Sequence, residues 1–271
     1  MGGEEKRVEE HEGALLSKID GAIAHFTINR PAKRNAMTLA MWERMGEIFK
    51  AWADMPEIRV IVLRGAGDKS FCAGADISEF AKLRVTPEQV AAYNAIVSKT
   101  YTIVRNIPKP TIARIEGSCM GGGLEVAQLC DIQIAADTAI FSIPPAKLGA
   151  AYKLEDTLLL VENIGAKATK EMLLTARSFS ADDALRWGLV NRVVSAKELD
   201  ATIDSLTTDI TANAPLSVKA SKLLVNQAQK ENNDRDYNLC NTLIDACTNS
   251  EDIVEGRQAF AEKRPPKFTG R

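Results

Sequence analysis

The sequence GSCMGGGLE, residues 117–125, lies between an apolar stretch at 111–115 and a stretch with helical character. The apolar stretch predicts a buried strand, and the glycine triplet 121–123 predicts a tight turn that opens the following helix. Backbone N–H groups and the positive end of the helix dipole converge at such a turn and stabilise a negatively charged oxygen. Glycine-rich turns can also serve only to allow close helix packing, so this segment by itself is weak evidence for a binding site. It lacks the Lys-Ser/Thr of a P-loop and the GxGxxG of dinucleotide-binding turns.

A second segment of small residues, SFCAGADI at 70–77, precedes a polar helical stretch. Small side chains let a ligand approach the main chain, which makes unpaired N–H groups available as donors. The simpler interpretation of this segment alone is an ordinary turn between a strand and a helix.

Strands and helices alternate around these two segments. The pattern predicts a hairpin of 15–19 and 23–28 around Asp20-Gly21, a helix at 38–55 capped by Thr38, and a helix at 87–105, with further strands at 60–63 and 132–135. Beyond Leu154 the pattern is mostly helical, at 154–163, 167–175, 181–187, 197–212, 216–230 and 236–247, with one strand at 189–194. We therefore expect an α/β protein with an N-terminal tail (1–13), a core (14–195) and a C-terminal helical region (196–271).

The composition excludes several classes of protein. Hydrophobic residues make up 45% and charged residues 26%, with a net charge of −2, which indicates a folded chain and argues against a dedicated nucleic-acid binder. No apolar run is long enough for a membrane span, and the first thirteen residues are too acidic for a signal or transit peptide.

Cysteine and histidine usage narrows the chemistry further. Five scattered cysteines without a CxxC pair favour a reducing compartment, which we expect to be the cytoplasm, and predict neither a disulfide framework nor a metal site. Of the two histidines, His11 falls near the terminus and His25 in a strand pattern, so imidazole catalysis is not expected.

Taken together, the two small-residue segments resemble the crotonase superfamily, also called the enoyl-CoA hydratase/isomerase family. The resemblance extends over nearly the whole chain. It includes Ile28 to Pro31 with Asn35-Ala36, FCAGAD, GGGLE followed by Cys130 to Ile132, the stretch 181–194, and Phe260 to Arg264.

The resemblance implies a spiral core of repeated ββα units and a C-terminal helical region that forms trimers, often stacked as hexamers. It also implies an acyl-CoA thioester as the ligand, with no cofactor because coenzyme A is part of the substrate. By position, the backbone N–H groups of Ala75 and Gly122 would form an oxyanion hole for the thioester carbonyl. Glu125 aligns with a catalytic glutamate of the family's hydratases, although a glutamate in a first helical turn also serves as a cap or dipole partner.

Two positions depart from the hydratase pattern. Where the hydratases have a second catalytic glutamate, this sequence has Pro145, which cannot transfer a proton. The segment 148–154, with Tyr152, resembles a loop of methylmalonyl-CoA decarboxylase-like members, whereas those members carry a histidine where this sequence has Ala75. Tyr152 could bind a carboxylate or a water, deliver a proton, or simply pack with its hydroxyl in solvent.

The resemblance also implies a set of coenzyme A contacts. Ala73, Asp76 and Ile77 would line the adenine and pantetheine side, and the cations Lys33 and Arg34 would contact phosphate. Phe260 and Lys263 match a Phe and a Lys that the family often supplies from a neighbouring subunit. Surface cations are more commonly only solvated, which is the alternative for the three basic residues.

These observations predict an acyl-CoA-processing enzyme of the enoyl-CoA hydratase/isomerase type, a lyase that stabilises a thioester enolate. One alternative is a decarboxylase of a malonyl-type thioester that uses Tyr152. A second is an acyl-CoA-binding protein without catalytic activity, which the absence of a second carboxylate at position 145 suggests.

Overall fold

The computed structural model describes residues 13–271, so the predicted tail, apart from Gly13, and His11 lie outside the described residues. The chain begins with the antiparallel hairpin β1 (Leu15–Asp20) and β2 (Ile23–Ile28). Its loop is Gly21-Ala22 rather than Asp20-Gly21, because Asp20 still pairs with Ile23. Gly21 has φ +58° whereas Ala22 has no positive φ, which is the pattern of a type II′ turn instead of the expected type I′.

After the hairpin, the 3-10 helix η1 (Pro31–Lys33) leads to α2 (Leu39–Ala53), which begins where Thr38 accepts a hydrogen bond from Met41 N. Three ββα units then follow. They are β3 (Val60–Gly65) and β4 (Ser70–Cys72) with α4 (Pro87–Asn106), β5 (Thr111–Ile115) and β6 (Ser118–Met120) with α5 (Gly122–Leu129), and β7 (Ile132–Ala136) and β8 (Ile140–Ser142) with α6 (Leu154–Thr175). The short elements η2 (Ile77–Glu79) and α3 (Phe80–Leu83) precede α4, and η3 (Pro145–Leu148) precedes α6.

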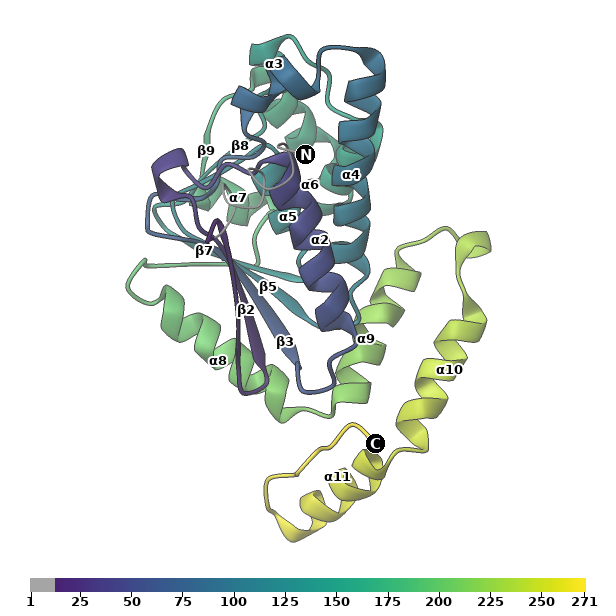
Figure 1. Cartoon of the computed structure of the whole chain (residues 1–271). Coiled ribbons are helices and arrows are strands. Elements are labelled where there is room, and N and C mark those ends of the chain that lie inside the picture. The colour runs from purple at the N-terminus through teal and green to yellow at the C-terminus, as the bar shows by residue number, and fades with distance from the viewer. Residues whose placement is uncertain (1–12) are drawn as a thin grey trace, which may run out of the picture.

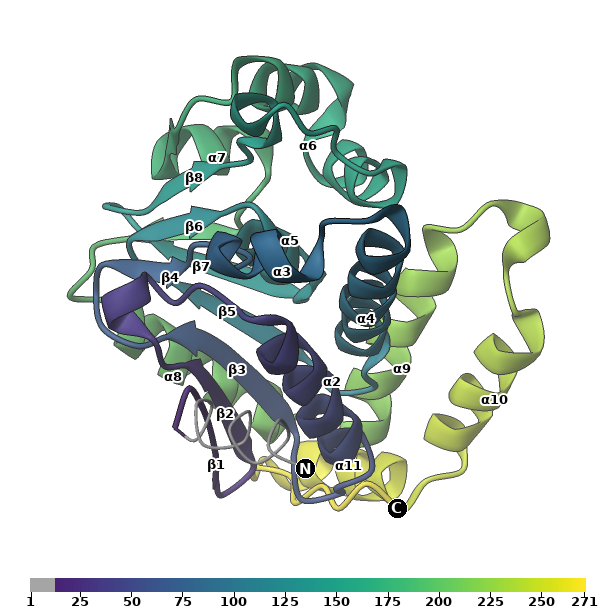
Figure 2. The same cartoon turned by 45° about the horizontal axis from the view of Figure 1, so that its top comes forward.

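Each unit contributes one strand to each of two sheets. The first strands lie in a six-stranded sheet of order β1-β2-β3-β5-β7-β10, and the second strands in a four-stranded sheet of order β4-β6-β8-β9. β9 (Phe179–Ser180), α7 (Ala181–Trp187) and β10 (Arg192–Val194) complete the core. Figure 2 shows β4, β6 and β8 following one another toward α6 and α7. This arrangement confirms the predicted spiral of ββα units.

Both faces of the central strands β3, β5 and β7 are buried, which explains their continuous apolar character. Ile61 and Leu63 point into the larger core beneath α2, α4 and α5, whereas Val60 and Val62 pack with Leu199 and Ile203 of α8 (Leu199–Ala212). Figure 1 shows the sheet between α8 and the pair α2 and α4.

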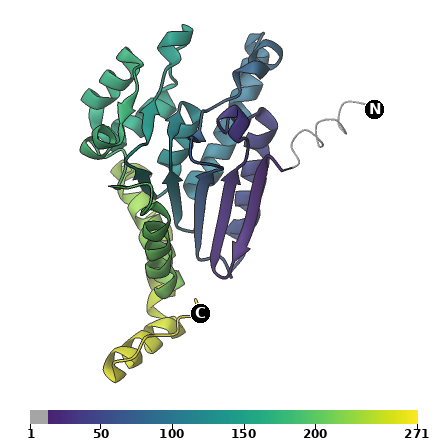
Figure 3. The same ribbon diagram turned by 90° about the vertical axis from the view of Figure 1, so that its left-hand side faces the viewer.

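The C-terminal helices lead away from the sheets. α9 (Pro215–Ala228) lies beside the core, and α10 (Tyr237–Thr248) and α11 (Glu251–Glu262) project beyond it (Figures 1 and 3). Within residues 13–271, no helix is both long enough and apolar enough to cross a membrane.

Most predicted helices are confirmed to within a few residues. Sequence reasoning missed β4, β6, β8 and β9, which have only two or three residues each and are too short to show a strand period. The helices predicted at 154–163 and 167–175 are the two parts of α6, which bends at Gly165 (φ +72°).

Candidate active site

The two small-residue turns meet at one edge of the four-stranded sheet. β4 and β6 are parallel neighbours with Cys72 opposite Cys119, so the residues that follow each strand emerge side by side. A Cβ atom placed on Gly74 would lie 3.1 Å from Gly122 N, and one placed on Gly123 would lie 2.4 Å from Cys72 O. Only glycine permits this approach, which brings Ala75 and Gly122 to the same cavity.

The backbone N–H groups of Ala75 and Gly122 are available as donors. The residues beside Ala75 are paired, because Met37 N donates to Gly74 O and Asp76 N donates to Met37 O, both at 2.8 Å. Gly122 is the first residue of α5, where an N–H has no partner within its helix. Among residues 13–271, neither N–H donates a hydrogen bond. Two free donors that reach one cavity are suited to hold an oxyanion.

Glu125 follows on the first turn of α5 and lines the same cavity. Its Oε2 accepts a hydrogen bond of 2.6 Å from the hydroxyl of Tyr101, which comes from α4. Burial raises the pKa of Tyr101 well above its usual value, and the charge of Glu125 raises it further. The proton therefore stays on the tyrosine, and the carboxylate is held in one orientation by a neutral donor.

The connection from β8 to α6 and the first turn of α6 supply another wall of the cavity, which has a volume of about 160 Å³. Tyr152 and Asp156 line it together with Glu125, whereas Pro145, in η3, does not. Burial raises the pKa of Tyr152 well above its usual value, followed by the effect of the Glu125 charge.

Unpartnered polar atoms mark the same cavity. Three buried side-chain polar atoms lack a hydrogen-bond partner within residues 13–271: Trp42 Nε1, Tyr93 Oη and Tyr152 Oη. All three residues line this cavity. Because buried polar groups are normally paired, these donors indicate a place where a polar ligand or water completes the site.

Residues predicted to contact coenzyme A form a surface beside Ala75. Arg34 O accepts hydrogen bonds from Ala73 N at 3.0 Å and Ser70 Oγ at 2.9 Å, which fixes the segment 33–37 alongside 73–77. Lys33 and Arg34 are exposed there, and Ile77 is 64% exposed. The structure therefore brings five of the seven predicted contacts together.

Asp76 is held within this surface by an ion pair. Its Oδ2 lies 2.9 Å from Arg30 Nη1, and its Oδ1 accepts a hydrogen bond from Ser78 Oγ. Partial burial favours the neutral acid, but the hydrogen bonds from Ser78 and Arg30 outweigh it and lower the pKa of Asp76. Asp76 is thus a charged residue that holds this surface in shape.

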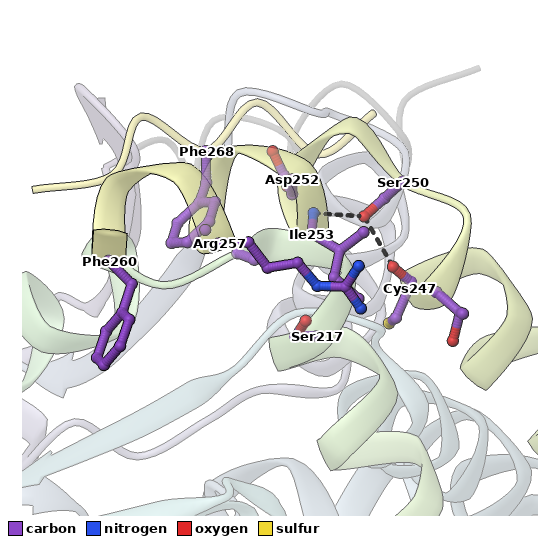
Figure 4. Close-up of a pocket in the computed structure, with 11 residues that line it drawn as sticks. Ser217, Cys247, Ser250, Asp252, Ile253, Arg257, Phe260 and Phe268 are labelled. Atoms are coloured by element: carbon purple, nitrogen blue, oxygen red, sulfur yellow. Dashed lines mark hydrogen bonds between the residues drawn. The ribbon is translucent and has the colours of Figure 1, made fainter. Parts of the chain in front are cut away.

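The other two predicted contacts, Phe260 and Lys263, lie at the far end of the molecule from α5 (Figure 1). Phe260 is 87% exposed, and Lys263 ends α11 with φ +55°. Figure 4 shows Phe260 at a separate C-terminal cavity with Arg257 and Phe268, where Ser250 Oγ donates to Cys247 O. A single chain therefore does not bring these two residues to Glu125.

Sequence reasoning missed Tyr101 and Asp156 as members of the site. Tyr101 sits in the middle of the long helix α4, and Asp156 in an acidic first turn of α6. Acidic first turns are common because they complement the helix dipole, so the sequence held no specific signal for Asp156. Among residues 13–271, no group of three or more His, Cys, Asp or Glu residues is placed to hold a metal ion.

Comparisons with known proteins agree with this fold. A sequence profile for enoyl-CoA hydratase/isomerase matches residues 18–271. The chain is 36% identical to the carnitinyl-CoA dehydratase of Proteus mirabilis, covering 93% of this chain and 96% of that protein. It is 34% identical to the short-chain-enoyl-CoA hydratase of Clostridium acetobutylicum, covering 94% and 97%. A crystal structure of an enoyl-CoA hydratase/carnithine racemase from Magnetospirillum magneticum superposes with a TM-score of 0.89 at 36% identity, covering 95% and 96%.

Proposed function

The chain belongs to the enoyl-CoA hydratase/isomerase family, and we propose that it is an acyl-CoA lyase that adds water to, or removes it from, a short acyl chain held as a CoA thioester. One observation carries this proposal. The unpaired N–H groups of Ala75 and Gly122 reach the same cavity as the carboxylate of Glu125. Oxyanion donors beside a proton-transfer group are what enolate chemistry on a thioester requires.

In this mechanism the thioester oxygen accepts hydrogen bonds from Ala75 N and Gly122 N. As negative charge develops on that oxygen, donors at about 2.7–3.1 Å stabilise it without reorganisation. Glu125, oriented by Tyr101, exchanges a proton with water or with the hydroxyl that leaves.

The size of the cavity supports a short acyl chain. Its volume of about 160 Å³ is roughly half of the ~300 Å³ at the lower end of pockets for drug-sized ligands. The relatives include a short-chain-enoyl-CoA hydratase, whose name specifies a short acyl chain.

Coenzyme A would lie along the surface formed by Lys33, Arg34, Ala73, Asp76 and Ile77, with its phosphates near the two cations. Because Phe260 and Lys263 are exposed and far from Glu125 of their own chain, they would complete the binding site of a neighbouring subunit. Exposed apolar residues on the projecting helices, including Ile244 and Val254, support a homotrimer or a dimer of trimers.

The five cysteines are free thiols, three of them buried, which supports the cytoplasm as the location.

Decarboxylation of a malonyl-type thioester is a second candidate function. The buried, unpartnered hydroxyl of Tyr152 supports it, because that donor would bind a substrate carboxylate. Tyr152→Phe should then lower the release of carbon dioxide from methylmalonyl-CoA. Unchanged release in this variant would remove Tyr152 from that reaction.

A panel of thioesters analysed by mass spectrometry separates these functions. Enoyl-CoA esters should gain the mass of one water, or 3-hydroxyacyl-CoA esters should lose it. Loss of carbon dioxide from malonyl-type esters would favour the decarboxylase instead. Tight binding of CoA esters without conversion of any member would favour an acyl-CoA-binding protein and contradict the lyase.

Glu125→Gln tests the proton transfer directly. This variant keeps the size of the side chain and its hydrogen bond from Tyr101 but cannot exchange a proton. We expect kcat to fall at least about 100-fold. Glu47→Gln, at an exposed position of α2, is the matched control and should leave kcat unchanged. Equal kinetics for both variants would exclude Glu125 from the mechanism.

A further inference from the structure

The cavity contains a second carboxylate that sequence reasoning did not consider. Asp156, on the first turn of α6, lines the cavity together with Glu125 of α5 and the buried hydroxyl of Tyr152. Asp156 is half-buried, and within residues 13–271 its carboxyl group makes neither a hydrogen bond nor an ion pair. Its place in the first turn of α6 suits the helix dipole, but no side chain or backbone group there pairs with its carboxyl group.

Addition of water across a double bond places one proton on carbon and removes another from water, and two separate groups serve these steps best. Glu125 is one such group. Residue 145 cannot be the second, because proline has no ionisable side chain and Pro145 does not line the cavity. Asp156 is the remaining carboxylate of the cavity wall.

We propose that Asp156 is the second acid–base residue of the site and exchanges a proton with C2 of the acyl chain. This inference rests on the proposed function, since it assigns a role within the same reaction. The charges of Glu125 and Asp156 both act on Tyr152, whose unpartnered hydroxyl would hold the substrate or a water.

The surroundings of the two carboxyl groups differ, which supports different roles for them in proton transfer. Burial, followed by the charge of Glu125, raises the pKa of Asp156 to about 6, whereas Lys153 acts in the other direction. Glu125 instead accepts a strong hydrogen bond from Tyr101. Two carboxyl groups in different environments serve as a proton donor and a proton acceptor. Three further ionisable groups on neighbouring elements line the cavity with Asp156: Arg84, Tyr93 and Tyr101, from the α3–α4 region. Glu155, on the first turn of α6, also raises the pKa of Asp156.

Hydration then needs two proton transfers, one at each carboxyl group. Glu125 takes a proton from water while the water oxygen bonds to C3, and the electrons of the double bond move to the thioester oxygen held by Ala75 and Gly122. The enolate collapses as C2 takes the proton of Asp156. Solvent then restores the proton to Asp156 and removes it from Glu125. In dehydration, the Asp156 carboxylate removes the C2 proton and Glu125 protonates the hydroxyl that leaves.

Two assays with the full-length protein test this role. The first measures hydration of crotonyl-CoA. The second measures exchange of the C2 hydrogens of butyryl-CoA with deuterium oxide, which requires enolate formation but no addition of water. Asp156→Asn should lower both rates at least about 100-fold. Glu162→Gln, at an exposed position further along α6, removes a carboxylate from the same helix and should leave both rates unchanged.

The pH profiles distinguish proton transfer from a structural role. Hydration needs protonated Asp156, so its rate should fall as the pH rises through about 6, whereas exchange needs the carboxylate and should rise over the same range. In Asp156→Asn, the residual rates of hydration and of exchange should show neither of these changes with pH. Asp156→Glu, which restores the carboxyl group, should recover part of the exchange.

The outcomes of these assays test the role of Asp156 and the proposed lyase function separately. Wild-type rates in a folded Asp156→Asn variant overturn the role of Asp156, and so does the absence of C2 exchange in the wild-type protein. If the wild type exchanges C2 hydrogens without hydrating any ester, the proposed lyase function fails. The loss of exchange in Asp156→Asn then still supports Asp156.

Discussion

At the scale of single residues, the site depends on glycines at a few crowded backbone positions. Gly74 has φ +88°, and a side chain there would meet Met120 O at 2.9 Å. Gly123 lies against the carbonyl of Cys72. Any side chain at either position would push the two turns apart and separate Ala75 N from Gly122 N. The oxyanion donors therefore depend on the absence of side chains as much as on the residues that provide them.

Tyr101→Phe tests a single hydrogen bond in this site. The variant keeps the aromatic ring against Trp42 but removes the donor that orients Glu125. We expect kcat to fall roughly 10- to 100-fold, which corresponds to the loss of a hydrogen bond to a charged group. KM should change little, because the oxyanion and coenzyme A contacts remain. Tyr237→Phe, at an exposed position of α10, is the control. A rise in KM at constant kcat would contradict a role in positioning Glu125.

At the scale of elements, the segment between β2 and α2 supports the surface proposed for coenzyme A. Asn35 is fully buried, with φ +56°. Its side chain accepts a hydrogen bond from Arg30 N at 2.9 Å and donates to Ala66 O at 3.0 Å and to Ser70 O at 2.6 Å. One amide thus joins the residue before η1 to Ala66 and to the first residue of β4, and so holds Lys33 and Arg34 beside Ala73.

Asn35→Ala should therefore affect both stability and binding. Three backbone groups lose their partner, and alanine tolerates a positive φ less well than asparagine, so the free energy of unfolding should fall by at least about 2 kcal/mol. KM for a CoA ester should rise as well. Urea unfolding and steady-state kinetics measure the two effects. Asn241→Ala, exposed on α10, should change neither. A stability loss without a change in KM would separate this segment from coenzyme A binding.

At the scale of the whole molecule, the C-terminal helices are joined to the core by buried polar contacts. Lys222 of α9 is 9% exposed. Its Nζ donates to Asp131 Oδ2 at 2.8 Å and to Lys109 O at 2.9 Å. Asp131 Oδ2 also accepts hydrogen bonds from Thr111 N and Oγ1. These contacts join α9, the helix before α10 and α11, to the core.

Lys222→Met tests this connection. The apolar part of the side chain is kept, but Asp131 loses its buried cation, so the free energy of unfolding should fall by about 1.5–3 kcal/mol. Amide exchange within α9 should also become faster. Lys219→Met, exposed on the same helix, is the matched control. If both variants unfold at the same urea concentration as the wild type, the Lys222–Asp131 contact does not hold α9 in place.

The sequence alone was sufficient to predict the features that depend on interactions between neighbouring residues. The cap at Thr38, the long helices and the two glycine-rich turns were recognisable because helical period, capping and backbone freedom are properties of neighbouring residues. The family resemblance, carried by the same turns and by Glu125, was confirmed by the comparisons.

Only the tertiary structure decided which distant residues share the cavity with Glu125. Tyr101 reaches it from a different ββα unit, and Asp156 from the helix that follows β8. In the smaller sheet, the strands β4, β6 and β8 that join these units have three residues each, and their pairing depends on packing between segments far apart in the chain. Such contacts leave no period or spacing in the sequence, because each residue responds to neighbours in space that the sequence alone does not name.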